Sequence, residues 1–211
     1  MTPFEASSAC EKICTLAPII PVLVVQDVAH AGPLARALVA GGLPALEVTL
    51  RTPAALDVIR AMMDVDGGIV GAGTVLTPAD VKAAKAAGAQ FAVSPGATDT
   101  LLQACLDTEL PLLPGAATAS ESMALLEKGY TVQKFFPAEA AGGAAALKAI
   151  GAPLPQVRFC PTGGVTLQNA PDYLALPNIL CAGGSWVAPK NLLAKLDWGG
   201  IEVLAREASQ L

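Results

Sequence analysis

Residues 44–74, PALEVTLRTPAALDVIRAMMDVDGGIVGAGT, indicate the fold class of this 211-residue chain. The apolar, β-rich runs 44–50 and 68–74 predict two strands, and the Ala- and Leu-rich stretch 53–63 between them predicts a helix. A strand, a helix and a second strand within about 30 residues are typical of a βαβ unit, in which the two strands run parallel. The segment therefore predicts an α/β fold.

The same alternation continues on both sides of this unit. We expect further strands at 19–25, 90–94, 110–113, 130–136, 156–160 and 179–182, and helices that include 31–41, 78–87, 97–107 and 119–127. Strands that recur roughly every 20–26 residues match the length of one βα unit. Eight such strands predict a (β/α)8 TIM barrel, with an N-terminal helix at 5–15 that could cap its bottom. A doubly wound open sheet remains the alternative, because a sequence cannot exclude a switch in strand order.

The composition fits strands that are buried on both faces. Hydrophobic residues make up 53% of the chain and aromatic residues only 4%, so the core must consist mainly of Ala, Val, Leu and Ile. No Ser/Gly-rich linker or charge block divides the chain, and we expect residues 1–211 to form one domain. The net charge of −5 argues against a general nucleic-acid or anionic-membrane surface, although a local cationic pocket for a small anion remains compatible with it.

The N-terminal region and the cysteines bear on localisation. The apolar run 16–25 is interrupted by Pro18 and Pro21 and is too short to span a bilayer, and no basic region precedes it. The five cysteines contain no CxxC pair, which favours ordinary reduced cysteines over a metal site. We expect a cytoplasmic protein.

Polar residues that interrupt a buried strand suggest a functional site. Glu47, Thr49 and Arg51 are spaced by two and therefore point to one face of the strand 44–50 and its end. Active sites of (β/α)8 barrels lie at the C-terminal ends of the strands. We expect a polar site here, and the alternative is a buried Glu–Arg pair that only fixes the strand.

Lys134 gives the most specific signal. Among eight lysines, it alone lies in a strongly β-forming aromatic run, YTVQKFFP (130–137). A lysine is rarely buried without a partner or a task. In a low-dielectric interior its pKa would fall, which leaves a fraction of neutral amine able to attack a carbonyl. The alternative is an ion-paired or snorkelling lysine at a strand end.

Small residues at other strand ends leave room for a ligand. GAGT (71–74) ends in Thr74, whose hydroxyl can bind a ligand, and Ser94-Pro95-Gly96 forms a sharp strand exit that can border a pocket. Packing and a simple strand-to-helix turn are the respective alternatives. The only histidine, His30, lies in an expected helix-entry loop, where we expect a surface or capping role, so acid–base work falls to Glu47.

The last two strands both end in paired glycines. They continue into PTGGV (161–165) and AGGSW (182–186). Backbone N–H groups of such turns can converge on an anion, and a following helix adds the positive end of its dipole. Because the phosphate site of (β/α)8 enzymes often follows strands seven and eight, the two turns predict a phosphate site.

Seven ordered segments then resemble one known family, the 2-keto-3-deoxy-6-phosphogluconate (KDPG) aldolases. The segments are EVTLRT (47–52), GAGTVL (71–76), FAVSPG (91–96), PLLPGAATASE (111–121), KFFPAEAAGG (134–143), RFCPTGGV (158–165) and CAGGSW (181–186). They span most of the chain, from about residue 21 to residue 186, and each lies at the end of an expected strand.

The resemblance implies a class I aldolase. This enzyme would cleave the phosphorylated keto acid to pyruvate and glyceraldehyde 3-phosphate, with Lys134 as the Schiff-base lysine and Glu47 as the general acid/base. The residues implied at the keto-acid end are Arg51, Thr74, Pro95 and Phe136. Those implied at the phosphate are Thr162, Gly163, Gly164, Gly184 and Ser185. The resemblance further implies a homotrimer that needs no metal or cofactor, and some family members also cleave 4-hydroxy-2-oxoglutarate.

Three other functions stay open at this point. The galactonate-derived epimer of the substrate differs in the configuration of one hydroxyl, which the sequence separates poorly. A sugar-phosphate isomerase could use Glu47 without covalent chemistry. A non-catalytic scaffold that keeps the barrel would need neither Glu47 nor Lys134.

Overall fold

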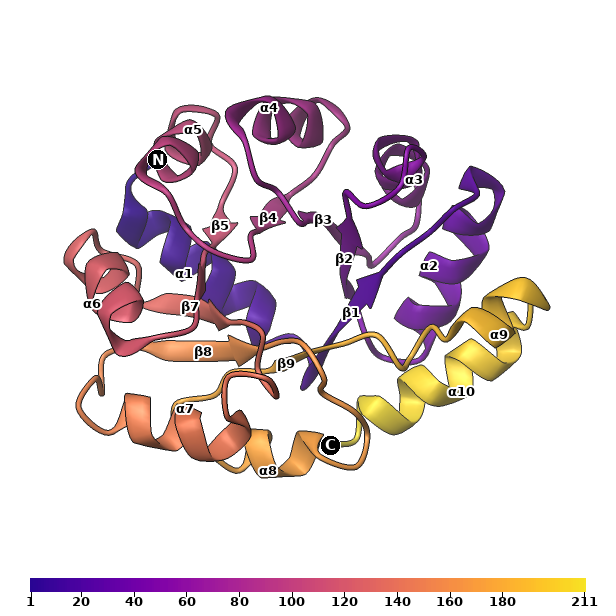
Figure 1. Ribbon diagram of the computed structural model, residues 1–211. Coiled ribbons are helices and arrows are strands. Elements are labelled where there is room, and N and C mark those ends of the chain that lie inside the picture. The colour runs from indigo at the N-terminus through magenta and orange to yellow at the C-terminus, as the bar shows by residue number, and fades with distance from the viewer.

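The computed structural model describes residues 1–211 as parallel strands that alternate with helices (Figure 1). The strands are β1 (Ile19–Leu23), β2 (Ala45–Thr49), β3 (Ile69–Gly73), β4 (Phe91–Val93), β5 (Leu112–Leu113), β6 (Gly115–Ala116), β7 (Val132–Phe135), β8 (Arg158–Pro161) and β9 (Ala182–Gly184). The helices are α1 (Pro3–Cys14), α2 (Ala31–Ala40), α3 (Ala55–Met62), α4 (Pro78–Ala86), α5 (Asp99–Asp107), α6 (Ala119–Glu127), α7 (Gly143–Gly151), α8 (Ala170–Leu174), α9 (Lys190–Ala194) and α10 (Trp198–Ala208), with a short 3-10 turn η1 (Val28–His30) before α2. The α/β class predicted from the sequence is confirmed.

The strands form two sheets. Six strands, in the order β5-β4-β3-β2-β1-β9, make a parallel half-barrel, and β6, β7 and β8 make a three-stranded sheet. The expected continuous ladder is interrupted at Pro114, which separates β5 from β6 and has no backbone N–H to donate. It is interrupted again between β8 and the last strand, where only the bridges Phe159↔Ile179 and Thr162↔Gly183 join the two segments.

The beginning and the end of the chain lie side by side. β9 pairs in parallel with β1, and α10 packs against α2 (Figure 1). α1 packs against β5 and β7, so the first helix of the chain contacts strands from its middle. These contacts hold together segments of the chain that are far apart in the sequence.

The buried apolar side chains fall into two separate clusters. The larger contains 48 buried residues, such as Leu34, Ile59 and Val81, and lies between the strands and the outer helices. The smaller, which we call the inner core, has ten buried residues contributed by α1 and by the opposite strand faces. Its members are Cys10, Cys14, Ile20, Ala45, Phe91, Val93, Leu113, Val132, Cys160 and Cys181.

Side-chain caps explain where several helices begin. Thr2, Thr77 and Thr118 each accept a hydrogen bond from the backbone N–H three residues later, and the acidic residue there bonds back to the threonine N–H. Such capping boxes satisfy two otherwise unpaired N–H groups at a helix start. None of the helices combines the length and the apolar character needed to cross a bilayer.

Candidate active site

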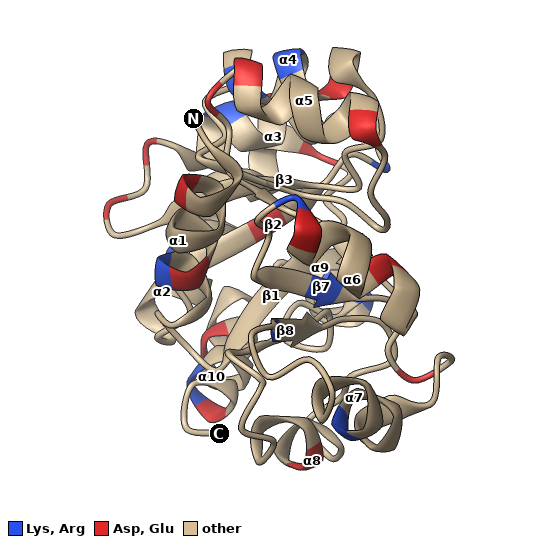
Figure 2. Ribbon diagram, turned by 90° about the vertical axis from the view of Figure 1, so that its left-hand side faces the viewer, with Lys and Arg blue, Asp and Glu red and all other residues tan.

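Lys134 and Glu47 lie opposite each other, on strands that are not neighbours in any sheet. The Nζ atom of Lys134 on β7 is 3.6 Å from Oε1 of Glu47 on β2, and the two side chains are only 5% and 4% exposed. Most other charged residues lie on the outer helices and loops (Figure 2). A buried amine beside a buried carboxylate is therefore the main polar feature of the interior.

Glycine on the neighbouring strand makes room for the carboxylate. β3 pairs with β2, and a Cβ atom on Gly73 would lie 2.3 Å from Oε1 of Glu47. Burial raises the pKa of Glu47, and the positive charges of Lys134 and Arg51 oppose this rise only in part. A carboxyl that holds its proton more readily than usual suits proton transfer near neutral pH.

Two neighbouring strands and an aromatic ring enclose Lys134. It pairs in register with Gly115 of β6 and Cys160 of β8, and its Nζ lies 5.1 Å from the centre of the Phe136 ring. Pro95 lies against the β6 side, because a Cβ atom on Gly115 would come within 2.3 Å of the Pro95 carbonyl. Phe136 thus lies beside the lysine, and Pro95 lies against Gly115, the residue that pairs with it.

Arg51 and Thr74 meet at the ends of β2 and β3. Nε of Arg51 donates a hydrogen bond to the Thr74 hydroxyl at 3.1 Å. Thr74 has a φ of 59°, which is rare for a β-branched residue, and such backbone strain clusters at functional sites. Arg51 is exposed, and its charge is close enough to lower the pKa of Glu47, so its guanidinium lies at the mouth of the site.

Thr49 does not join this site. The sequence predicts its hydroxyl beside Glu47 and Arg51, but the hydroxyl donates to the Leu23 carbonyl of β1 at 2.8 Å. A buried hydroxyl takes the nearest free acceptor, which here belongs to the adjacent strand. Thr49 therefore fastens two strands together.

The two glycine turns come together after β8 and β9. Gly163 and Gly164 have φ values of 102° and 80°, a region open mainly to glycine. Thr162 bridges to Gly183, where a Cβ atom would lie 2.3 Å from the Thr162 hydroxyl. Gly184 ends β9, and the exposed Ser185 follows it. All five residues expected at the phosphate therefore belong to one pair of adjoining turns.

The sequence interpretation missed Glu139 and Tyr173. The Tyr173 hydroxyl donates to the Glu139 carboxylate, and a Cβ atom on Gly164 would lie 2.7 Å from the Glu139 side chain. The Glu139 N–H also donates to the Gly163 carbonyl at 3.0 Å. Glu139 thereby contacts both glycines of the first turn. The signal available was a single acidic residue in KFFPAEAAGG (134–143).

The only histidine lies outside this cluster. His30 ends η1, and its ring meets Trp198 edge-on with 5.7 Å between the ring centres. It makes no side-chain cap at the start of α2, although the sequence suggested a surface or capping role.

Comparison with known proteins identifies the family. The family model for KDPG and KHG aldolases matches residues 10–204. The chain belongs to this aldolase family. A KHG/KDPG aldolase of Escherichia coli K12 is 52% identical over 202 residues, which is 95% of each chain. Aldolases are lyases, so the family is one of carbon–carbon bond-cleaving enzymes.

Solved structures of this aldolase family have the same fold. A KDPG aldolase of Zymomonas mobilis ZM4, crystallised with 3-phosphoglycerate, is 51% identical and has a TM-score of 0.91 over 94% of both chains. A KDPG aldolase of Legionella pneumophila, with pyruvate captured at low pH as a covalent carbinolamine intermediate, is 47% identical with a TM-score of 0.91, over 94% of this chain and 97% of that one. The resemblance read from the sequence is thereby confirmed.

Proposed function

We propose that this chain is a class I aldolase that cleaves 2-keto-3-deoxy-6-phosphogluconate to pyruvate and glyceraldehyde 3-phosphate through a Schiff base on Lys134. The observation that carries the proposal is the buried Lys134–Glu47 pair at 3.6 Å. Relatives with 51–52% sequence identity support the assignment of this substrate, since they are named for it. The E. coli relative is also named for KHG, and we propose 4-hydroxy-2-oxoglutarate as a second substrate on that ground.

The first half of the reaction joins substrate to enzyme. Neutral Nζ of Lys134 attacks the keto carbon C2 and forms a carbinolamine, while Glu47 accepts and returns protons as water leaves. The product is a protonated imine, which withdraws electrons from the neighbouring carbons. Because the raised pKa of Glu47 brings it closer to neutrality, the same carboxyl can both accept and donate a proton.

The second half breaks the C3–C4 bond. A base removes the proton of the C4 hydroxyl, the C3–C4 electron pair moves into the imine, and glyceraldehyde 3-phosphate leaves as the aldehyde. Protonation of the resulting enamine at C3, followed by hydrolysis, frees pyruvate and restores the amine of Lys134. The atoms balance without an added oxidant or reductant.

Groups at both ends would hold the substrate over the lysine. We assign Arg51 to the substrate carboxylate, with Thr74 and Pro95 lining the same keto-acid end and Phe136 beside the pyruvyl carbons. We assign the binding of the substrate phosphate to the two glycine turns, through Thr162, Gly163, Gly164, Gly184 and Ser185. Fixing both ends contributes to catalysis by positioning the scissile bond.

We also propose that the strands close into a (β/α)8 barrel that forms one domain. Two observations support a closed (β/α)8 barrel in one domain: the bridges that join β8 to the last strand, and an inner core separate from the outer one. Two such cores are expected of a barrel, whose interior is filled with side chains. We further propose a homotrimer located in the cytoplasm.

Borohydride trapping tests the proposed chemistry. Reduction in the presence of pyruvate should add a stable pyruvyl mass to the peptide that carries Lys134, and Lys134→Ala should abolish both the adduct and KDPG cleavage. Lys195→Ala, which changes an exposed lysine, is the matched control and should retain both. Absence of the adduct from the folded parent protein, together with absence of KDPG cleavage, would instead favour a sugar-phosphate isomerase that uses Glu47 without covalent chemistry.

Comparing cleavage rates for the two substrate epimers tests the specificity. We expect faster cleavage of the gluconate-derived compound. A preference for the galactonate-derived epimer would assign the chain to the other substrate while leaving the Schiff-base chemistry intact.

A further inference from the structure

A pocket of about 480 Å³ lies near the start of β8, at the opposite end of that strand from the glycine turns. Arg158 begins β8 and Thr162 follows it, so roughly 13 Å separate them at about 3.3 Å per residue. The pocket is bordered by the last turn of α7 and by the segment after α8. Its lining residues are Lys148, Gly151, Ala152, Pro155, Arg158, Leu176, Pro177 and Asn178.

The charge of the lining is entirely positive. Lys148 and Arg158 contribute two cations, and no aspartate or glutamate lines the pocket. Neither cation takes part in an ion pair, since the five pairs of the structure involve other residues. Both cations of the pocket therefore lack an acidic partner, in a chain whose net charge is −5.

Two hydrogen-bond donors of the pocket are also left without a partner. Nε of Arg158 and Nδ2 of Asn178 are buried donors without a partner. The backbone carbonyls of Lys148, Gly151, Leu176 and Asn178 already accept bonds from backbone N–H groups. Arg158 and Asn178 thus each leave a buried donor free, and each such donor costs about 1–3 kcal/mol until an acceptor reaches it.

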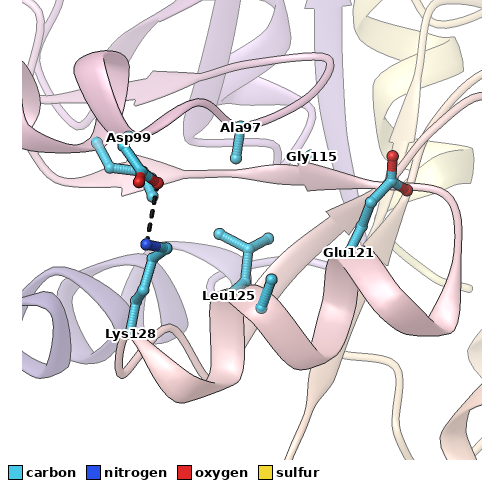
Figure 3. Close-up of a pocket in the computed structure, with 8 residues that line it drawn as sticks. Ala97, Asp99, Gly115, Glu121, Leu125 and Lys128 are labelled. Carbon is cyan, nitrogen blue, oxygen red and sulfur yellow. Dashed lines mark ion pairs between the residues drawn. The ribbon is translucent and has the colours of Figure 1, made fainter.

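A second cavity, between α5 and α6, shows the contrast. It is also lined by a lysine, Lys128, but this residue pairs with Asp99 at 2.9 Å (Figure 3). Glu121, at the other end of the same cavity, accepts bonds from Ala117 and Thr118. The charged groups of the α5–α6 cavity thus have ionic or hydrogen-bonding partners within the protein, whereas the two cations of the β8 pocket have no ionic partner.

We propose that the β8 pocket is a second binding site, specific for a small oxyanion such as a phosphorylated or carboxylated metabolite. The guanidinium of Arg158 provides paired donors that match phosphate and carboxylate oxygens, and Lys148 adds a second charge. Asn178 supplies a neutral donor on the same wall. This inference is independent of the proposed aldolase function, because no residue of the pocket belongs to the Lys134 site.

Arginine Nε–H signals in NMR spectra give a site-resolved test on the intact protein. The chain has five arginines, and loss of a signal in Arg158→Gln assigns Arg158. Titration with inorganic phosphate should shift the Arg158 signal saturably and leave exposed Arg60 unchanged. Lys148→Gln should weaken the fitted affinity at least threefold, whereas Lys195→Gln should not.

Two further titrations fix the ligand class and exclude a general salt effect. Saturation with phosphate but not with succinate indicates a phosphate group, and saturation with succinate but not with phosphate indicates a dicarboxylate; each outcome supports the oxyanion site. The proposal is overturned if neither anion saturates the Arg158 signal, or if sodium chloride at equal ionic strength reproduces the shift. Failure here would leave borohydride trapping at Lys134 unaffected, so the two proposals are tested separately.

Discussion

At the scale of single residues, the Lys134–Glu47 pair is better explained by chemistry than by stability. Removing two charges from water costs several kcal/mol per ion, and their attraction often does no more than offset this cost. A well-packed apolar pair could replace them with little loss of folding stability. The presence of both groups, 3.6 Å apart in an apolar interior, therefore favours a catalytic role.

Glu47→Gln tests that role through the pH profile. Loss of the acid/base group should lower kcat by roughly 100- to 10,000-fold. In the parent, the carboxylate is the base and its pKa is raised, so activity should fall as the pH drops through a value above that of an ordinary carboxyl. Glu47→Gln should lack this acidic limb. The control variant Glu127→Gln, which changes an exposed residue of α6, should keep it. An unchanged limb in Glu47→Gln would assign it to another group.

Arg51→Ala tests recognition of the substrate carboxylate. Loss of a charge-assisted hydrogen bond worth about 1.5–3 kcal/mol should raise KM by roughly 10- to 100-fold. Arg60→Ala serves as the matched control, because Arg60 pairs only with Asp57 on the surface of α3. Steady-state kinetics with the phosphorylated keto acid measure both variants, and a KM within twofold of the parent in Arg51→Ala would place the carboxylate elsewhere.

Residue-scale prediction succeeded where strand alternation fixes the direction of a side chain. Lys134 and Glu47 are conspicuous because each is a charge in an apolar run, and a two-residue period tells which face it occupies. Thr49 shows the limit, since alternation does not say which acceptor a hydroxyl will find. Glu139 lies in a loop, where no period applies, and its partner Tyr173 is 34 residues away.

At the scale of elements, the sequence placed every strand to within a few residues, with two informative deviations. The expected strand 110–113 continues past Pro114 as β6, because proline interrupts the ladder without changing the direction of the chain. The expected strand 179–182 is found as Ala182–Gly184. Glycine is rare in strands, so its β-propensity gave no signal for a segment that is held by pairing with β1.

Gly73→Ala tests how β3 accommodates the site. The new methyl group would overlap Oε1 of Glu47, which lies 2.3 Å from its position, and we expect destabilisation of about 1–3 kcal/mol together with a large loss of kcat. Gly199→Ala in α10 is the control. Its nearest neighbour would be 3.9 Å away, so stability should stay level or rise by about 0.5–1 kcal/mol. Urea unfolding and kcat measure both variants, and equal behaviour of the two would show that Glu47 moves aside freely.

At the scale of the whole molecule, α1 ties the start of the chain to its middle. The Ser7 hydroxyl, buried on this helix, accepts a hydrogen bond from the Thr131 N–H across 124 residues. Cys10 and Cys14 of the same helix complete the inner core. The sequence predicted this helix and its position before the first strand, but no local pattern could reveal its contact with β7.

Ser7→Ala measures how much the hydrogen bond between Ser7 and Thr131 contributes to stability. Loss of the acceptor leaves the Thr131 N–H unpaired, so the free energy of unfolding should fall by about 1–3 kcal/mol in urea titrations. Ser8→Ala, one position along the same helix, is the matched control. Its hydroxyl makes no hydrogen bond, and its substitution should change stability by less than about 0.5 kcal/mol. Equal effects of the two substitutions would show that helix propensity, rather than the Thr131 contact, determines the result.

The pairing of β9 with β1 also affects how the protein is made. Ile19 leaves the ribosome long before Ala182, its partner in the sheet, has been translated. During that interval one edge of β1 has no strand to pair with, and open strand edges invite association between nascent chains. Long-range pairings also slow folding, because a large loop must close before they form. We therefore expect synthesis of this chain to depend on chaperone protection of its N-terminal half until the last strand emerges.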